Sequence, residues 1–269
     1  MSQDGFSQVA LPTVESPEPD AVKGMFASLA QRYDLLNSLL SQGQDRRWRR
    51  RAAQLTRART GDKVLDVCTG TGALAALLRR RVGASGEVVG VDITEAMLEV
   101  ARARSPEVSF LVADACDLPF PGASFDAATM AFGLRNISDR QMALNELARV
   151  LRPGGRAVIL EFSQVHPLLR PAYGWYSRRL IPMIARGVMG RDSAYRYLTD
   201  SIAAFASPEQ VTSWLRQAGF DPVHQYRMTA GVVAIHVGRR QEQRVSRAAA
   251  GGLGSPPPVR AAPSRPVRS

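Results

Sequence analysis

From residue 63 to residue 161, short runs of β-branched and apolar residues alternate with stretches whose apolar residues recur at helical spacing. The pattern predicts strands at 63–67, 87–91, 108–112, 125–131 and 155–161, with helices at 74–81, 95–104 and 140–150. Strands and helices that alternate in this way build a parallel sheet with helices on its faces. The sequence therefore predicts an α/β fold with a doubly wound, mostly parallel sheet.

The flanking regions complete a single domain at 21–238. Helical spacing predicts an N-terminal helical cap at 21–60, with helices at 22–40 and 46–58, and another helix at 208–218. Strands at 223–228 and 231–237 are expected to form an antiparallel hairpin at the edge of the sheet. The aromatic-rich segment 164–206 interrupts the alternation and is expected to lie on the substrate side. The acidic segment 1–20 and the Arg- and Pro-rich tail 239–269 read as disordered.

Composition narrows the class of protein. Cys68 and Cys116 are the only cysteines, so neither a disulfide scaffold nor a Cys-rich zinc site is expected, and no metal is predicted. No apolar run reaches 18 residues, and the N-terminal segment lacks the basic and apolar layout of a signal peptide. We therefore expect a cytoplasmic protein that does not span a membrane.

Acidic residues stand at the carboxyl ends of the first three predicted strands, where open parallel sheets bind their ligands. These are Asp66, Asp92 and Asp114. The turn after the first strand contains Gly70 and Gly72, whose backbone freedom allows a ligand to approach closely. Asp92 follows those glycines by about 20 residues, the spacing at which an acid accepts hydrogen bonds from a ribose diol. The pattern predicts a nucleoside-containing cofactor.

The Gly-rich turn suits either a nicotinamide dinucleotide or S-adenosylmethionine, since its letters G-T-G-A-L-A also satisfy a dinucleotide pattern. Charge favours one of them. A carboxylate at Asp66 would repel a pyrophosphate but attract the ammonium and sulfonium groups of S-adenosylmethionine. Asp114 is also suited to accept a hydrogen bond from an adenine amino group. We therefore predict S-adenosylmethionine as the cofactor.

Several motifs, in one order between residues 25 and 238, resemble a known family. V-L-D-V-C-T-G-T-G, V-G-V-D-I-T-E-A-M-L and A-R-V-L-R-P-G-G-R are similar to class I S-adenosylmethionine-dependent methyltransferases. The segments M-F-A-S-L-A-Q-R-Y-D-L-L-N, F-G-L-R-N, D-S-A-Y-R-Y-L and T-A-G-V-V-A-I-H narrow the match. Together they resemble the UbiE/MenG family of quinone-biosynthesis C-methyltransferases.

The resemblance implies methylation of a ring carbon in a prenylated quinol, 2-demethylmenaquinol to menaquinol, and in some members a benzoquinol as well. It implies cofactor contacts at Thr71, Asp92, Asp114 and Ala115. Two positions depart from the pattern of many members: this chain has Ala73 in place of an acid and Ala131 in place of a serine. We keep Ala131 among the expected cofactor-binding residues, although a serine contact would be missing there.

A ring carbon attacks a sulfonium methyl group only after a ring hydroxyl loses its proton, so the site needs a base or a group that stabilises an oxyanion. The three histidines lie outside the first four strand-end loops. The resemblance implies a part in deprotonation for Arg135, but a guanidinium stays protonated, so we predict that Arg135 stabilises the oxyanion or orients water. The alternative is a salt bridge that holds the loop. Asp192 and Tyr195 are the other catalytic candidates.

The net charge of +11 includes five arginines around Trp48, in the segment 46–51. This segment is interpreted either as a solvated helix face or as a surface that contacts an anionic membrane. Nucleic acid is not expected, because the chain reads A-F-G-L-R-N where an RNA methyltransferase would have an N-P-P-Y type motif. Apolar residues at Phe26, Leu29, Tyr33 and Leu36 and in 175–189 predict either a prenyl groove or core packing.

Two alternatives remain for the identity of the methyl acceptor. One is a dual enzyme that also methylates the ubiquinone-pathway benzoquinol, and the other is a methyltransferase for a different lipophilic phenolic acceptor such as a sterol or polyketide. The arginine-rich composition is typical of a GC-rich genome and favours a bacterium that makes only menaquinone.

Overall fold

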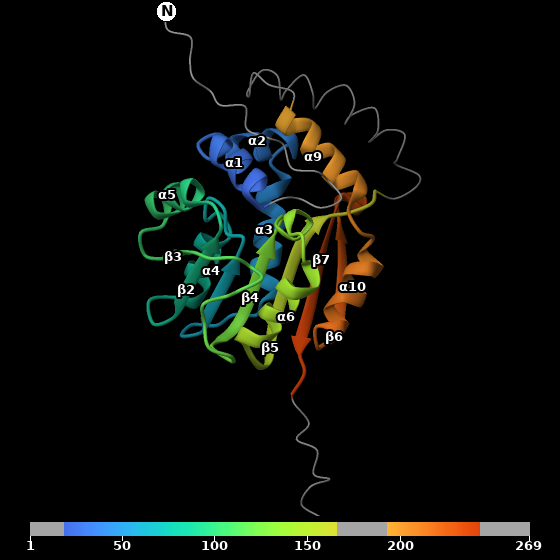
Figure 1. The fold of residues 1–269 in the computed structure, drawn as a ribbon. Coiled ribbons are helices and arrows are strands. Elements are labelled where there is room, and N and C mark those ends of the chain that lie inside the picture. The colour runs from blue at the N-terminus through green and yellow to red at the C-terminus, as the bar shows by residue number, and fades with distance from the viewer. Residues whose placement is uncertain (1–18, 166–192, 243–269) are drawn as a thin grey trace, which may run out of the picture.

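The computed structural model describes residues 19–165 and 193–242. Its strands form one seven-stranded sheet in the order β3-β2-β1-β4-β5-β7-β6 (Figure 1). They are β1 (Lys63–Val67), β2 (Glu87–Asp92), β3 (Ser109–Val112), β4 (Phe125–Ala131), β5 (Leu151–Phe162), β6 (Phe220–Met228) and β7 (Val233–Arg240). The first five are parallel, β7 is antiparallel to β5, and β6 is antiparallel to β7. The predicted fold class is confirmed.

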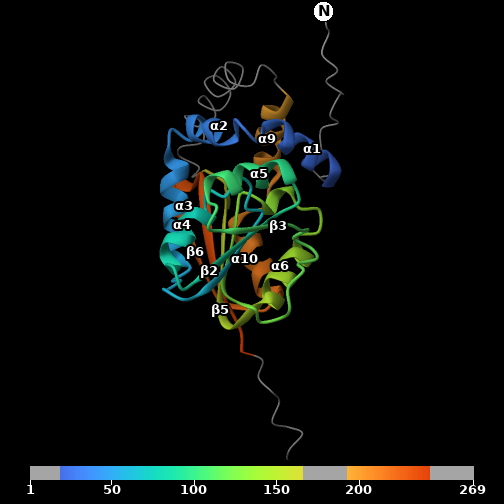
Figure 2. The same ribbon diagram turned by 90° about the vertical axis from the view of Figure 1, so that its left-hand side faces the viewer.

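Helices cover both faces of the sheet. They are α1 (Pro19–Leu29), α2 (Tyr33–Leu40), α3 (Gln44–Leu55), α4 (Ala75–Val82), α5 (Glu95–Arg104), α6 (Arg140–Val150), α9 (Ser193–Ala204) and α10 (Pro208–Gln217). Figure 2 shows α3 and α4 on one face of the sheet and α6 and α10 on the other. In both views α1, α2 and α9 lie at the same end of the molecule, above the carboxyl ends of the parallel strands.

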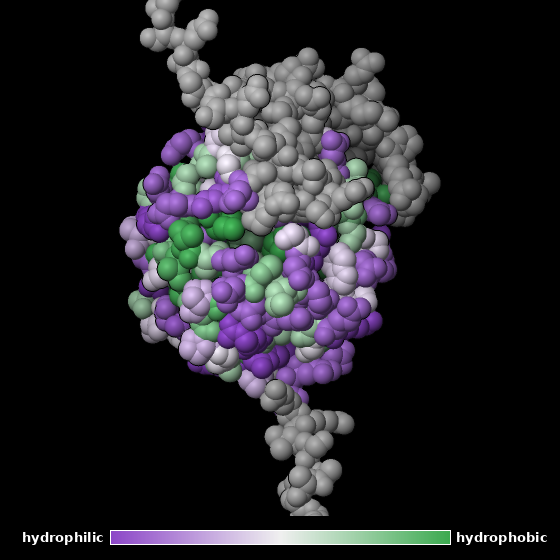
Figure 3. All heavy atoms as spheres, viewed as in Figure 1, coloured by the Kyte–Doolittle hydropathy of each residue, from purple (hydrophilic) through white to green (hydrophobic). Residues whose placement is uncertain are grey.

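The central strands are apolar because the helical layers bury both of their faces. Leu65 of β1, Met130 of β4 and Ile159 of β5 are fully buried. By contrast, β3 forms an edge, and its residues Leu111 and Val112 are 43% and 44% exposed. Apolar side chains are visible on that side of the molecule in Figure 3. Within the described ranges, no helix is long and apolar enough to cross a membrane.

Several boundaries differ from the sequence predictions. The predicted helix 22–40 is two helices, because α1 packs on α5 whereas α2 packs on α3, and the chain turns between them. The fifth strand begins at Leu151, which pairs with Phe125 before a register shift in the Arg-Pro-Gly-Gly segment. The described elements also extend slightly into both segments predicted as disordered, since α1 begins at Pro19 and β7 ends at Arg240.

The interpretation of segment 46–51 as one exposed basic face is wrong. Trp48 is only 2% exposed, and its indole N–H donates to Thr229 Oγ1 at 2.8 Å. Arg49 is 7% exposed. These two residues lie on the side of α3 that faces the sheet, because Ala52 and Ala53 follow one turn later and are buried there too. The exposed arginines of this segment are Arg46, Arg47, Arg50 and Arg51.

Candidate active site

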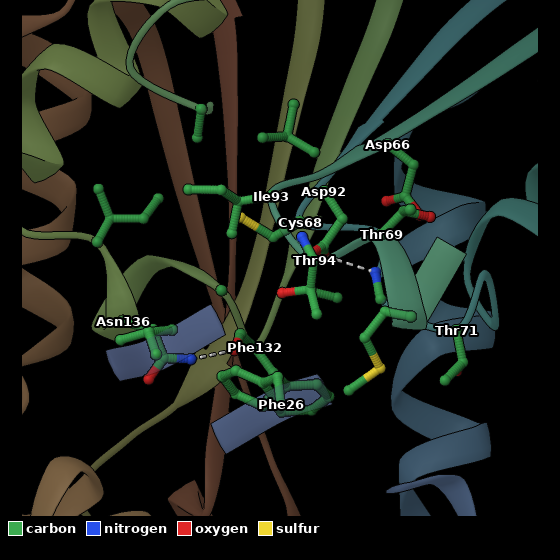
Figure 4. A pocket seen from close by; sticks show the side chains of 18 of the residues that line it. Phe26, Asp66, Cys68, Thr69, Thr71, Asp92, Ile93, Thr94, Phe132 and Asn136 are labelled. Atoms are coloured by element: carbon green, nitrogen blue, oxygen red, sulfur yellow. Dashed lines mark hydrogen bonds between the residues drawn. The ribbon is translucent and has the colours of Figure 1, made fainter. Parts of the chain in front are cut away.

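A cavity lies at the carboxyl ends of the parallel strands, beneath α1 and α2. Its wall is built from the segments that follow β1, β2, β3 and β4. Figure 4 shows Asp66 and Asp92 on one side of this cavity, with Phe132 and Asn136 on another. Seven of the eight predicted cofactor-binding residues line it: Asp66, Gly70, Thr71, Asp92, Asp114, Ala115 and Ala131.

Asp66 is a buried carboxylate whose hydrogen-bond donors are hydroxyl groups. Thr69 Oγ1 donates to one carboxylate oxygen at 2.7 Å, and Thr129 Oγ1 donates to the other at 2.5 Å. Burial raises the pKa of Asp66 from 3.8 to about 6, although both threonines and the charge of Arg49 oppose that rise. A cation that entered the cavity would favour the ionised form of this carboxylate.

Asp92 and Asp114 are oriented by backbone N–H groups. Asp92 Oδ2 accepts from Gly70 and Oδ1 from Thr94, both at 2.9 Å. Burial raises the pKa of Asp92, and these two hydrogen bonds oppose the rise. Asp114 Oδ1 accepts from the N–H of Cys116 at 2.8 Å. Both carboxylates are therefore held in position in the cavity wall.

The glycines of the turn have different roles. Gly70 has a positive φ of +56° and lines the cavity. Gly72, with a φ of +73°, is not among the lining residues. A Cβ at Gly72 would lie 3.0 Å from the Cβ of Ala101 and 3.1 Å from the ring of Phe110. Gly72 therefore allows the turn to pack closely against α5 and β3.

Thr71 ties the N-terminal helices to the Gly-rich turn. Its hydroxyl donates to Asp34 Oδ1 at 2.8 Å and accepts from Arg104 Nη1 at 3.0 Å. Arg104 also forms an ion pair with Asp34. Phe26 and Tyr33, whose rings pack edge to face, line the cavity from α1 and α2. The helical cap thus closes over the site through polar contacts and supplies part of its apolar wall.

Arg135 is enclosed in the loop after β4. Its Nη1 forms an ion pair with Glu161 Oε1 at 2.8 Å and donates to the carbonyl of Phe132 at 2.7 Å. The backbone N–H of Arg135 also donates to Glu161. The guanidinium lies over the ring of Phe162, and Arg135 is not among the lining residues. This geometry corresponds to the alternative prediction, a salt bridge that holds the loop.

The model of the ubiE/COQ5 methyltransferase family matches residues 14–240. The chain belongs to the ubiE/COQ5 methyltransferase family. This membership confirms the predicted methyltransferase class and, with it, S-adenosylmethionine as the cofactor. Because the match spans most of the chain, it includes the cavity, the helical cap and the last two strands.

Relatives of this methyltransferase cover nearly the same length. A demethylmenaquinone methyltransferase of Thermus thermophilus is 48% identical over 224 residues, which are 80% of this chain and 100% of the relative. The ubiquinone/menaquinone biosynthesis C-methyltransferase UbiE of Ralstonia nicotianae is 42% identical over 240 residues, 88% of this chain and 97% of the relative. A solved S-adenosylmethionine-dependent methyltransferase of Thermotoga maritima, titled a possible histamine N-methyltransferase, has the same fold. Its TM-score is 0.59 at 21% identity, with 81% and 99% of the two chains covered.

The two departures from the family pattern both fall on the cavity wall. Ala73 and Ala131 line it, so neither position offers a polar side chain to the cofactor.

Asp192 lies outside the described residues, as does His166. The backbone of Tyr195 belongs to α9, whereas its side chain is not part of the described structure. His236 is buried away from the cavity, with Nε2 2.9 Å from the carbonyl of Pro208, and burial lowers its pKa to about 4.

Arg49 was missed as a residue of this site. It lies among the cavity-lining residues and is the one arginine or lysine that lines the described part of the cavity. Sequence reasoning treated it as one of five surface arginines. The signal that would have separated it is its helical position, since the small apolar residues Ala52 and Ala53 follow it by three and four residues.

Proposed function

We propose that this methyltransferase transfers the methyl group of S-adenosylmethionine to a ring carbon of a prenylated quinol, with 2-demethylmenaquinol as substrate and menaquinol as product. The observation that carries the proposal is the 48% identity to a demethylmenaquinone methyltransferase over that relative's whole length. The second candidate is a dual enzyme that also acts on the ubiquinone-pathway benzoquinol. The 42% identity to a relative named for both pathways favours it.

The charges of the cavity support the choice of methyl donor. Asp66, Asp92 and Asp114 are carboxylates at the ends of adjacent strands. When bound, S-adenosylmethionine supplies an electrophilic methyl group on a sulfonium. We propose that Asp92 accepts hydrogen bonds from its ribose diol and that Asp114 accepts one from its adenine amino group. Thr71, Ala115 and Ala131 contribute to the wall around it.

On the acceptor side, Arg135 and Glu161 hold the loop that carries Phe132 and Asn136 against the cavity. We propose that Arg135 positions this loop and that Asp192 and Tyr195 act on the ring hydroxyl, whose proton must leave before the ring carbon can attack. The ring then loses the proton of the methylated carbon to regain aromaticity.

A lipid substrate requires an apolar path and access to the bilayer. Val22, Phe26 and Tyr33 present an apolar wall at the cap side of the cavity. Next to this wall, α2 exposes Leu35 and Leu39, which are 56% and 40% exposed. We propose that these leucines and the exposed arginines of α3 contact an anionic membrane surface. Replacing Arg46, Arg47, Arg50 and Arg51 by Gln should weaken binding to phosphatidylglycerol vesicles, and unaltered binding would contradict the proposal.

Methyl transfer from labelled S-adenosylmethionine tests the main proposal. Purified protein is offered demethylmenaquinol and the demethylated benzoquinol separately in detergent. Label in menaquinol alone supports a dedicated menaquinone enzyme, and label in both products supports the dual enzyme. Transfer to neither quinol, by protein that binds the cofactor in calorimetry, contradicts the proposal and directs the search to other lipophilic phenols. Asp92→Ala, which removes the expected ribose acceptor, is the negative control.

A further inference from the structure

Arg49 places a buried positive charge in the cavity wall, among carboxylates. It comes from α3, outside the strand-end loops that supply most of the other polar groups. Its side chain is 8% exposed. A cation is costly to bury unless charged or polar partners surround it. The groups that surround Arg49 must therefore compensate for the burial of its charge.

The partners of Arg49 hold it in place but leave donors free. Nη1 forms an ion pair with Asp45 Oδ2 at 2.6 Å, one helical turn earlier. Asp45 in turn accepts from Ser41 Oγ at 3.1 Å. The guanidinium lies 5.3 Å from the ring centre of Phe132, which closes its other side. A guanidinium has five N–H donors, and among the described residues only Nη1 has a hydrogen-bond partner.

The position of Arg49 relative to Asp66 gives the cavity two opposite charges. The two residues are close enough for the charge of Arg49 to lower the pKa of Asp66. They do not form an ion pair with each other, since Asp66 is hydrogen-bonded by Thr69 and Thr129 and Arg49 is paired with Asp45. Such a pair of separately held charges matches a zwitterion, which presents an ammonium and a carboxylate a few ångströms apart.

We propose that Arg49 binds the carboxylate of the methionine moiety of S-adenosylmethionine, while Asp66 binds its ammonium group. The inference rests on S-adenosylmethionine as the cofactor and not on the identity of the acceptor. Three carboxylates and one cation line the described wall, and the ligand offers cationic and ribose groups to the former and one carboxylate to the latter. A guanidinium can donate two parallel hydrogen bonds to a carboxylate, which the ammonium group of a lysine cannot do with the same geometry. Asp45 is the residue that positions this guanidinium.

Calorimetry with two ligands separates recognition of the carboxylate from a general structural role. Wild type, Arg49→Gln and the control Arg50→Gln, an exposed neighbour on the same helix, are titrated with S-adenosylmethionine and with its decarboxylated analogue. We expect Arg49→Gln to bind S-adenosylmethionine about 10- to 100-fold more weakly, the range for a hydrogen bond to a charged group. The analogue should bind wild type and Arg49→Gln alike, and Arg50→Gln should match wild type with both ligands.

Two results would overturn the inference: an equal loss of affinity for both ligands, or no loss for either. Thermal unfolding of each variant shows whether it is folded. If Arg49→Gln does not fold, Arg49→Met together with Asp45→Leu replaces the buried pair by apolar side chains, which proteins often tolerate. This double variant should also lose its preference for the carboxylated ligand, and a retained preference would exclude Arg49. Failure of methyl transfer to a quinol would leave these binding results unchanged, so the two proposals fail separately.

Discussion

The carboxyl ends of β1 and β5 each carry a buried acid, but the two acids are neutralised differently. Asp66 is 1% exposed and accepts from two threonine hydroxyls, and it lines the cavity. Glu161 is 2% exposed and accepts from the guanidinium and the backbone N–H of Arg135, and it does not line the cavity. Burial alone therefore does not identify a binding residue. We propose that the distinguishing property is the source of the opposite charge, which the protein supplies to Glu161 and a bound ligand would supply to Asp66.

The largest expected effect is on the ion pair of the β5 side. Glu161→Gln leaves the Arg135 guanidinium buried without a counter-charge, and removing one partner of a buried pair costs about 3–5 kcal/mol in unfolding free energy. Urea denaturation measures this loss. The matched control, Arg135→Met together with Glu161→Leu, replaces both charges and should recover most of the stability. A Glu161→Gln variant within 1 kcal/mol of wild type would show that the pair does not hold the loop.

A smaller effect on the unfolding free energy is expected at Asp66, where the buried charge destabilises the folded protein. Its pKa in the folded protein is about 6 and its ordinary value is 3.8, so between these values the folded state binds more protons than the unfolded state. The stability that this carboxyl contributes is complete below about pH 3.8 and is lost as pH rises through about 6, a difference of about 3 kcal/mol. The measurement is the unfolding free energy between pH 4 and pH 8. Asp66→Asn should remove this part of the pH dependence.

The same carboxyl should make cofactor binding depend on pH in the other direction. A bound cation favours ionised Asp66, so affinity for S-adenosylmethionine should decrease about tenfold per pH unit below about 6. Calorimetry at several pH values measures this, with Asp66→Asn as the control that binds weakly at every pH. A wild-type affinity that stays constant from pH 5 to pH 7 would mean that another group receives the ammonium.

The smallest expected effect belongs to an ion pair on the β1 side, between Asp34 of the cap and Arg104. Its side chains are 33% and 34% exposed, so solvent screens the pair, and Asp34→Ala should cost less than about 1 kcal/mol. The loss of the contact with Thr71 should instead speed dissociation of the cofactor, measured by stopped flow. Glu95→Gln breaks the exposed pair with Arg102, away from Thr71, and should leave dissociation unchanged. Equal dissociation rates in both variants would contradict a role of the cap contact.

Much of the fold could be predicted from the sequence because its signals are local. The boundaries of β1, α5, β4 and α6 agree with the predicted ones, since apolar runs and helical spacing are read within a few residues. The acids at the strand ends could also be predicted to converge, because parallel strands end at the same edge of a sheet. The helix at 22–40 was predicted wrongly as one piece, since its break depends on distant packing partners.

The surroundings of individual charges could not be predicted, because they depend on residues far apart in the chain. Arg135 was predicted to face the acceptor, but its partner Glu161 is 26 residues later, on the neighbouring strand. Arg49 was interpreted as exposed, and its contact is with the ring of Phe132, which lies much farther along the chain than Glu161 does from Arg135. The side-chain direction of a charged residue on a helix follows from the apolar residues one turn away. The number of arginines in 46–51 does not contain this information.

The position of β7 between β5 and β6 also has a consequence for how the chain is made. β5 is buried along most of its length and pairs with β4 on one side, but its other edge pairs with residues 233–240, which are synthesised later. At ordinary rates of translation, the intervening segment takes on the order of ten seconds to synthesise. During that interval the growing chain presents an apolar strand edge with free N–H and C=O groups, the kind of surface on which chains aggregate. Pairing of this edge is therefore completed only after the last strand of the sheet has been synthesised.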